Sequence, residues 1–289
     1  MYRMMIVGII GLMVVHNGLD FVRRWKDRTK TVNPGAVATA TDPKYLRFTR
    51  NERAQHWLLA LSFITLAVTG FMLTMGWSVP GVSGQTGAML RAGAHRLAAG
   101  VLIAVGVYHL GYLAFTTRGR RTIRDMVPKL NRFANVMCCA GSCLRLGPPS
   151  TSDWKDVVQM VKYNLGLTRE RPQFGRFSYA EKMEYFALVW GTLVMMVTGF
   201  ALWFEVPFLN RFPFWSFQLV TVVHYYEAIL ATLAIVVWHF YFTMFNPTVF
   251  PISKAMITGE IAREEMEREH SQELCALDYA ERADPPDRP

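Results

Sequence analysis

Long apolar stretches limit what this chain can fold into more than any other feature of its sequence. Four of them contain enough residues to cross about 30 Å of hydrocarbon as helices, which rise about 1.5 Å per residue. They are Ala54–Gly76, Leu97–Thr116, Glu184–Phe204 and Gln218–Phe245. The sequence therefore predicts an all-α membrane protein.

The composition and the placement of charge agree with this class. Hydrophobic residues make up 52% of the chain, and the mean hydropathy is +0.17 although the formal net charge is +9. The lysines and arginines lie in the gaps between the apolar stretches rather than along one helix face. We therefore expect membrane lipid around the chain and no nucleic-acid partner.

A fifth candidate span, Met4–Val22, is less apolar. It contains three polar residues, His16, Asn17 and Asp20. A signal peptide is the alternative, but no small-residue cleavage site follows the apolar part, and Arg23, Arg24 and Lys26 flank the wrong end. We expect residues 1–25 to form a retained transmembrane helix, which gives five spans.

Loop charges predict the orientation of these spans. Nine lysines and arginines lie between Arg23 and Arg53, and the long loop Thr117–Lys182 is again strongly basic. The loops Trp77–Ala94 and Glu205–Phe217 contain one arginine each. Basic loops stay on the cytoplasmic side, so we expect the amino terminus outside and the carboxyl terminus inside a bacterial cytoplasmic membrane.

Two segments on the cytoplasmic side have patterns of their own. Ser152 is the expected N-cap of an amphipathic helix over Asp153–Leu167 that lies on the membrane. Its apolar residues at helical spacing are Trp154, Val157, Val158, Val161 and Leu165. The tail, residues 251–289, is acidic from Glu260 onward and ends in DPPDRP, so we expect Glu260–Pro289 to be mobile.

The four cysteines identify no cofactor. Cys138, Cys139 and Cys143 form a CCAGSC cluster, and Cys275 lies alone in the tail. The sequence has no CxxCH motif, so it encodes no covalent attachment of c-type haem. Free thiols in a reducing compartment are the favoured interpretation of the cluster, with a metal or redox role left open.

An internal repeat relates two parts of the chain at one offset of 129 positions (181 − 52 = 129). The offset takes Glu52-Arg53 onto Glu181-Lys182, the VTGF of Val68–Phe71 onto that of Val197–Phe200, and His95 onto His224. We infer two copies of a helical hairpin, residues 52–115 and 181–245, joined by the loop 117–182. Together they predict a four-helix bundle over residues 48–250.

The histidines carry the main functional signal, because six of the seven lie in or at the ends of predicted spans, where an ionisable side chain is costly. His95 and His109 are 14 residues apart on one helix. His224 and His239 are 15 apart on another. At ~100° per residue, each spacing returns the side chain to within about 60° of one face, ~21 Å along the helix. Facing helices with this spacing offer axial imidazole pairs at two levels, which predicts b-type haem.

Two other interpretations of these histidines are weaker. Zinc would need three or four ligands around one point, and Glu227 is the only acidic residue beside the histidines within the spans. A single transmembrane histidine can also do no more than hydrogen-bond a neighbouring helix.

The predicted topology assigns the histidines to two levels. His95 and His224 start helices that enter from the outside, so they form the outer level. The inner level has four candidates, His16, His56, His109 and His239. Either two of these four are bystanders or the inner side holds two haems. The repeat alone favours His109 with His239.

One segment resembles a known family. FTRNERAQHW (Phe48–Trp57), running into VTGF, is similar to the first helix of the membrane cytochrome b subunits of formate dehydrogenase, nickel-iron hydrogenase and thiosulfate reductase. The resemblance covers about Phe48 to Phe250. It implies that one haem is held by the residues matching His56 and His239. The other haem is held by those matching His95 and His224.

Two features depart from the simplest pattern of that family. They are His109 in VYHLGYL and the helix carrying His16 in VVHNGLD, and both resemble the variants that partner periplasmic multihaem cytochromes c. The closing NPTVFPISKAMITGE also resembles that group. A third haem between His16 and His109 follows as an expectation. In the alternative, each of the two hydrogen-bonds a backbone carbonyl or a haem propionate.

The resemblance also implies a function. Family members pass electrons between a periplasmic redox subunit and the quinone pool, here menaquinone or ubiquinone near the cytoplasmic face. The candidate quinone-site residues are Tyr179, Glu181, Lys182, Glu184 and Tyr185, which could equally be an ordinary charged cluster at the membrane interface. No residue looks like a nucleophile or a substrate-processing base, so we expect an electron conduit rather than a complete enzyme. Two alternatives are a self-sufficient transmembrane reductase with a small donor such as ascorbate, and a non-redox membrane anchor.

Overall fold

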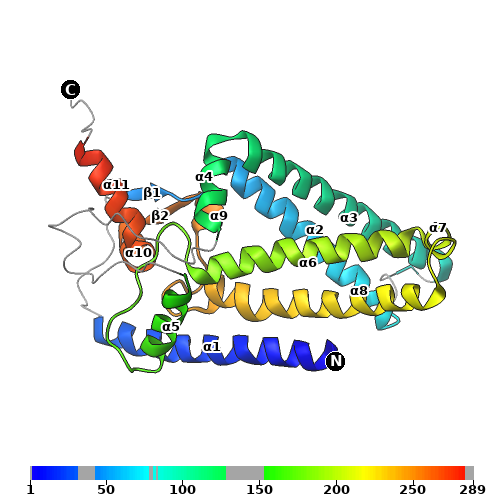
Figure 1. Ribbon diagram of the computed structural model, residues 1–289, viewed down its shortest axis with the longest axis horizontal. Coiled ribbons are helices and arrows are strands. Elements are labelled where there is room, and N and C mark those ends of the chain that lie inside the picture. The colour runs from blue at the N-terminus through cyan, green and yellow to red at the C-terminus, as the bar shows by residue number, and fades with distance from the viewer. Residues whose placement is uncertain (1, 32–42, 78–80, 83, 128–152, 284–289) are drawn as a thin grey trace. The chain divides into compact units, whose positions relative to one another are not determined.

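The structure, a computed structural model, describes residues 2–31, 43–77, 81–82, 84–127 and 153–283. Five of its helices are long and apolar enough to cross a membrane, which confirms the five predicted spans. They are α1 (Tyr2–Thr31), α2 (Arg50–Thr74), α3 (Gly84–Phe115), α6 (Tyr179–Trp203) and α8 (Phe214–Ala234) with its π-helical continuations η2 (Ile235–His239) and η3 (Tyr241–Phe245) (Figure 1).

The helices begin earlier than the apolar stretches that predicted them. The largest difference is in α3, which starts at Gly84 rather than Leu97 because its first turns contain three alanines but also Arg91 and Arg96. Hydropathy locates the part of a helix that lies in hydrocarbon, whereas the backbone continues wherever propensity allows. His95 therefore lies inside α3, not at its start.

The starts of α2 and α6 are fixed by matching capping boxes. The Glu52 carboxylate accepts from the Thr49 backbone N–H at 2.8 Å, and the Thr49 hydroxyl accepts from the Glu52 N–H at 3.3 Å. Ser178 and Glu181 repeat both bonds, at 2.7 and 3.3 Å. Such reciprocal bonds satisfy amide groups that a helix start leaves without partners. The 129-residue offset thus extends to the capping residues (178 − 49 = 129).

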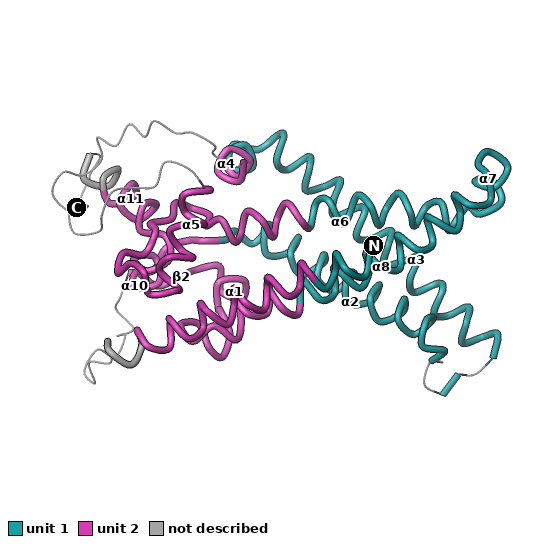
Figure 2. Tube along the Cα trace, turned by 60° about the horizontal axis from the view of Figure 1, so that its bottom comes forward, with its two compact units in different colours: residues 1–7, 48–120, 188–235 teal, residues 8–47, 121–187, 236–289 magenta. Residues whose placement is uncertain are grey.

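The chain divides into two compact units (Figure 2). Unit 1 contains residues 1–7, 48–120 and 188–235, and within it α2 and α3 pack against each other as a hairpin. Unit 2 contains residues 8–47, 121–187 and 236–289. Its main hydrophobic core is formed by Met160, Phe174, Tyr179, Ala180 and Trp238.

The remaining elements are short. The helices are α4 (Thr117–Met126), α5 (Asp153–Asn164), α7 (Glu205–Leu209), α9 (Ala255–Thr258), α10 (Arg263–Glu269) and α11 (Ser271–Ala283). A two-stranded antiparallel sheet pairs β1 (Lys44–Leu46) with β2 (Glu260–Ala262), with Tyr45 opposite Ile261. This small sheet is the exception to the predicted all-α fold among the described residues.

Helix α5 confirms the helix expected over Asp153–Leu167, although it ends at Asn164. Met160 is buried in the unit 2 core and Val157 packs against that core, whereas the side chain of Trp154 is 71% exposed. The apolar stripe is therefore divided between a protein core and an exposed surface. Its placement on the membrane stays a prediction, and Ser152, the expected N-cap, lies outside the described residues.

The expectation of a mobile tail is wrong for Glu260–Ala283, which forms β2, α10 and α11. A second hydrophobic cluster of unit 2 buries the side chains of Ile261, Met266 and Leu274. The tail therefore has a small hydrophobic core although its composition is acidic. Cys275, which the sequence left alone, is disulfide-bonded. The CCAGSC cluster and residues 284–289 lie outside the described residues.

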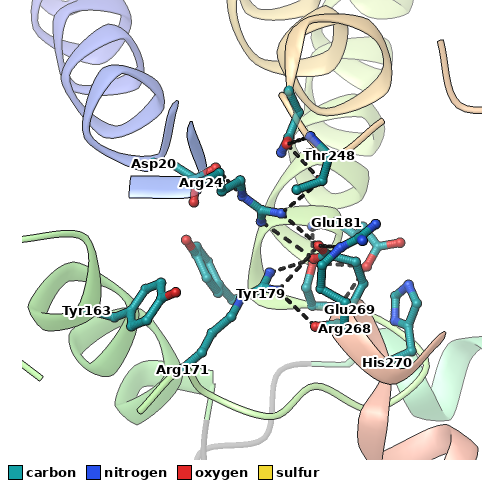
Figure 3. A network of polar contacts seen from close by, with 12 residues as sticks. Asp20, Arg24, Tyr163, Arg171, Tyr179, Glu181, Thr248, Arg268, Glu269 and His270 are labelled. Carbon is teal, nitrogen blue, oxygen red and sulfur yellow. Dashed lines mark hydrogen bonds and ion pairs between the residues drawn. The ribbon is translucent and has the colours of Figure 1, made fainter. Parts of the chain in front are cut away.

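Ion pairs also hold the tail within unit 2 (Figure 3). Glu269 accepts from Arg24 at 2.6 Å and from Arg171 at 2.5 Å. Arg24 donates in addition to Asp20 at 2.7 Å, and the Asp20 carboxylate accepts from the Tyr241 hydroxyl at 2.7 Å. Burial alone would raise the pKa of Glu269, but the guanidinium groups of Arg171 and Arg24 lower it well below its usual value.

Replacing Glu269 with glutamine is expected to loosen the tail. Removing one partner of a buried ion pair costs about 3–5 kcal/mol, and we expect roughly 2–3 kcal/mol because the Glu269 side chain is 21% exposed. Hydrogen exchange of α11 amides in the detergent-solubilised protein measures this local free energy. The matched control is Glu264→Gln, since the Glu264 side chain is 82% exposed and its pair with Arg268 lies at the surface.

The same experiment has a defined pH dependence. The pKa of Glu269 is lower in the folded tail than in the unfolded chain, so its stabilisation is complete above the ordinary glutamate pKa and is lost as pH falls through the folded value. Protection of α11 in the parent protein should therefore decrease on acidification, and less so in Glu269→Gln. Equal pH dependence in both proteins would contradict the assignment.

Candidate functional site

Two histidines of unit 1 are held in the same way by two threonines. The Nδ1 atom of His95 on α3 lies 2.8 Å from the hydroxyl of Thr69 on α2. The Nδ1 atom of His224 on α8 lies 2.8 Å from the hydroxyl of Thr198 on α6. Both members of each pair are related by the 129-residue offset (198 − 69 = 224 − 95 = 129). The repeat therefore reproduces a contact as well as a residue type.

The threonine contacts determine which ring nitrogen carries the proton. The Thr69 hydroxyl donates to the Thr65 carbonyl at 2.6 Å, and the Thr198 hydroxyl donates to the Val194 carbonyl at 2.7 Å. Each hydroxyl has already used its one hydrogen, so it accepts from the histidine Nδ1–H. We infer that the Nε2 atoms of both histidines carry the lone pair that a metal requires.

The VTGF motif supplies more than this threonine. A Cβ atom added at Gly70 would lie 3.7 Å from Cε1 of His95, and one added at Gly199 would lie 3.4 Å from Cε1 of His224. The motif thus combines a hydrogen-bond acceptor for each ring with an adjacent glycine that leaves space beside it.

Two further histidines also have Nδ1 bonded to a side-chain oxygen of the preceding long helix. Within unit 1, Nδ1 of His109 donates to the Gln55 side-chain carbonyl at 2.7 Å, while the amide nitrogen of Gln55 donates to Asn51 at 2.9 Å. Within unit 2, Nδ1 of His239 donates to the Glu184 carboxylate. Gln55 and Glu184 are repeat equivalents (184 − 55 = 129). His109 and His239 are therefore held with the same tautomer, with Nε2 as the lone-pair nitrogen.

A π-helical segment explains why the two histidine spacings differ. His239 follows His109 by 130 positions rather than 129, so the second copy contains one extra residue. The π-helical segment η2, Ile235–His239, lies within the stretch from His224 to His239 and ends at His239 itself. A π-helical turn accommodates one additional residue without ending the helix. The insertion therefore keeps His239 in the role that His109 has in the first copy.

His16 is held differently from these four histidines. Its Nδ1 atom lies 3.2 Å from the Asn17 side-chain oxygen, and its Nε2 atom accepts from the Tyr179 hydroxyl at 2.7 Å. The Asn17 amide donates to the Val237 carbonyl at 2.6 Å, which fixes its oxygen toward His16. Both ring nitrogens of His16 are thus engaged by protein groups. The predicted third haem between His16 and His109 is not tested by this arrangement and stays a prediction.

The candidate quinone-site residues have structural partners. Tyr179 is buried and bonds His16, and Glu181 caps α6 and pairs with Arg47 at 3.0 Å. Lys182 is buried and pairs with Asp153 at 2.6 Å. These contacts describe an ordered cluster at the start of α6. Whether it binds quinone stays a prediction.

The described residues also bear on the choice of cofactor. They contain no group of three or more His, Cys, Asp or Glu side chains that could hold a metal ion. Histidines with Nδ1 bonded and Nε2 available fit the axial positions of haem.

Sequence reasoning found the histidines but missed Thr69, Thr198 and Gln55, although VTGF and the 129-residue offset contained the signal.

Comparison with known proteins gives one finding about the family. The family model described as prokaryotic cytochrome b561 matches residues 2–129 and 138–259. These ranges include all five apolar helices and the six histidines discussed above. No curated protein matches the chain.

Proposed function

Because the chain belongs to the prokaryotic cytochrome b561 family, we propose that this integral membrane haem protein transfers electrons between a periplasmic redox partner and the quinone pool. The family binds b-type haem, which supplies one-electron redox chemistry between two imidazole ligands. The observation that carries the proposal is the repeated histidine–threonine contact, since it prepares two Nε2 atoms for iron in equivalent positions.

We assign one haem to His95 and His224. The threonines hold the two rings in the ligand tautomer, and Gly70 and Gly199 lie beside Cε1 of the two rings. By the loop charges this haem belongs to the outer side, where a multihaem cytochrome c or another redox subunit would exchange electrons with it. The amino terminus is outside in the same proposal.

We assign the second haem, on the cytoplasmic side, to His239. Its partner is His56 according to the family resemblance, or His109 according to the repeat. His56 lies half-buried on α2 with its ring edge-on to Trp57. His109 has its Nδ1 atom bonded to Gln55, as a ligand position requires.

Menaquinone or ubiquinone is the proposed mobile substrate near this second haem. Quinone reduction consumes protons as well as electrons, so its site needs groups that can bind quinone oxygens and pass protons. The start of α6 presents all five candidate residues together, which supports a site there: Tyr179, Glu181, Lys182, Glu184 and Tyr185. A small-donor reductase is the alternative, and it would not require a quinone.

A direct test uses the purified, haem-loaded protein and a soluble menaquinol analogue. We expect dithionite to give reduced b-type absorption bands, and the quinol to reduce at least one haem within the same preparation. Substituting Lys182→Met should slow the quinol reaction while dithionite reduction is unchanged. Absence of reduced b bands would contradict haem binding. Reduction by ascorbate alone, with none by quinol, would favour the small-donor reductase.

A further inference from the structure

We propose that Glu184 is a positioning residue that lowers the reduction potential of the haem bound through His239. The inference rests on the proposed function, because His239 has to be an iron ligand. It concerns a difference in hydrogen-bond acceptors between the two copies of the repeat.

The histidines of the repeat differ in what receives their Nδ1 proton. Three have neutral acceptors, namely the hydroxyls of Thr69 and Thr198 and the amide of Gln55. His239 alone of these four donates to a carboxylate, that of Glu184. The repeat therefore places one charged acceptor among otherwise neutral ones.

The equivalence of Gln55 and Glu184 makes this difference specific. Both residues lie six positions after the capping residue of their helix (55 − 49 = 184 − 178 = 6). Both bond the Nδ1 atom of a histidine near the far end of the next long helix. Glutamine and glutamate have nearly the same size and shape. In both copies this position therefore supplies a side-chain oxygen to the histidine, and in the second copy that oxygen belongs to a charged carboxylate.

No other cation offsets this charge among the described residues. Glu181, one turn before it, is paired with Arg47, and Glu52 in the first copy is paired with Arg118. The ion pair of Glu184 in the same part of the chain is with His239. Its negative charge is therefore directed at the imidazole rather than shared with a guanidinium or ammonium group.

The chemical consequence follows from ligand basicity. A carboxylate that accepts the Nδ1–H bond pulls the proton away from the ring and makes Nε2 a stronger electron donor. A stronger donor stabilises ferric over ferrous iron, so the haem is harder to reduce. Amide and hydroxyl acceptors produce this effect more weakly. The His239 haem should therefore have the lower potential of the two.

Redox titration of the purified holoprotein tests the proposal. In Glu184→Gln, which copies the first repeat, we expect the midpoint potential of one haem to rise. The expected change is at least about tenfold in its reduction equilibrium, about 59 mV for one electron. The other haem should be unchanged. The matched control is Glu264→Gln, which removes the same charge from a side chain that is 82% exposed and should leave both midpoints near the parent values.

Three further results complete the test. Glu184→Asp, which keeps the charge, should stay near the parent potential, and it can be titrated even if Glu184→Gln binds too little haem. A raised midpoint in Glu184→Asp would count against the charge as the cause. An unchanged midpoint in Glu184→Gln, or an equal shift in Glu264→Gln, would overturn the proposal. If His239→Ala retains every haem, the ligand assignment fails instead, which separates failure of the proposed function from failure of this inference.

Discussion

Replacing either His95 or His224 with alanine is expected to remove one whole haem from each chain, and the same haem in both cases. If His95 and His224 together hold one haem iron, either substitution would leave that haem with a single histidine ligand, and we expect it to be lost. The two histidines are held by equivalent threonines in unit 1, so neither is better placed to hold the iron alone. Pyridine haemochrome assay against protein concentration measures the loss.

The control for this pair is a histidine that serves the fold. His270 lies in the tail, where its Nδ1 atom donates to the Gly175 carbonyl at 3.0 Å, and His270→Ala should retain the parental haem content. The double variant His95→Ala/His224→Ala should lose no more haem than either single variant. Additive losses, or a full haem complement in one single variant, would show that the two residues serve different haems.

His239→Ala is expected to remove the other haem completely. The same assay on His56→Ala and His109→Ala then identifies its partner, since the true partner should reproduce the His239→Ala loss. The resemblance predicts His56, whereas the shared Nδ1 contacts and the π-helical insertion relate His239 to His109. Identical haem contents in His239→Ala and the parent would contradict the second site.

The parental haem count decides the third haem at the same time. Three haems per chain, falling to two in both His16→Ala and His109→Ala, would support it, and two in the parent would not. Binding iron would require the Nε2 atom of His16 to give up its hydrogen bond from Tyr179. The buried Tyr179 hydroxyl would then lose its hydrogen-bond partner, which adds a free-energy cost to haem binding at His16.

The spans and the histidines could be predicted because both obey periodic rules. Hydropathy reports twenty-residue apolar runs directly, and a fixed offset of 129 reveals a repeat without any structural knowledge. The contacts of the ring nitrogens could not be predicted in this way. They depend on which face of α2 and α6 turns toward the histidines, which a one-residue change in register would alter.

The tail shows a different limit of sequence reasoning. Its composition is that of a disordered segment, yet Glu269 meets two arginines that lie far from it in the chain, Arg24 and Arg171. Mean charge and hydropathy contain no information about such long-range pairs. The π-helical segment was not predicted either. The only sign of it in the sequence is that the two histidines of the second copy are 15 residues apart, whereas those of the first copy are 14 apart.

The ion pair between Arg24 and Glu269 sets the order in which the protein can be assembled. The two residues are 245 positions apart, so at 5–20 residues per second the first helix waits roughly 12–50 s on the ribosome for its last partner. During that interval Asp20 and Arg24, four residues apart on the same helix, can neutralise each other. Biogenesis thus begins with a helix that carries its own counterion, and Glu269 joins Asp20 on the same guanidinium group once it has been synthesised.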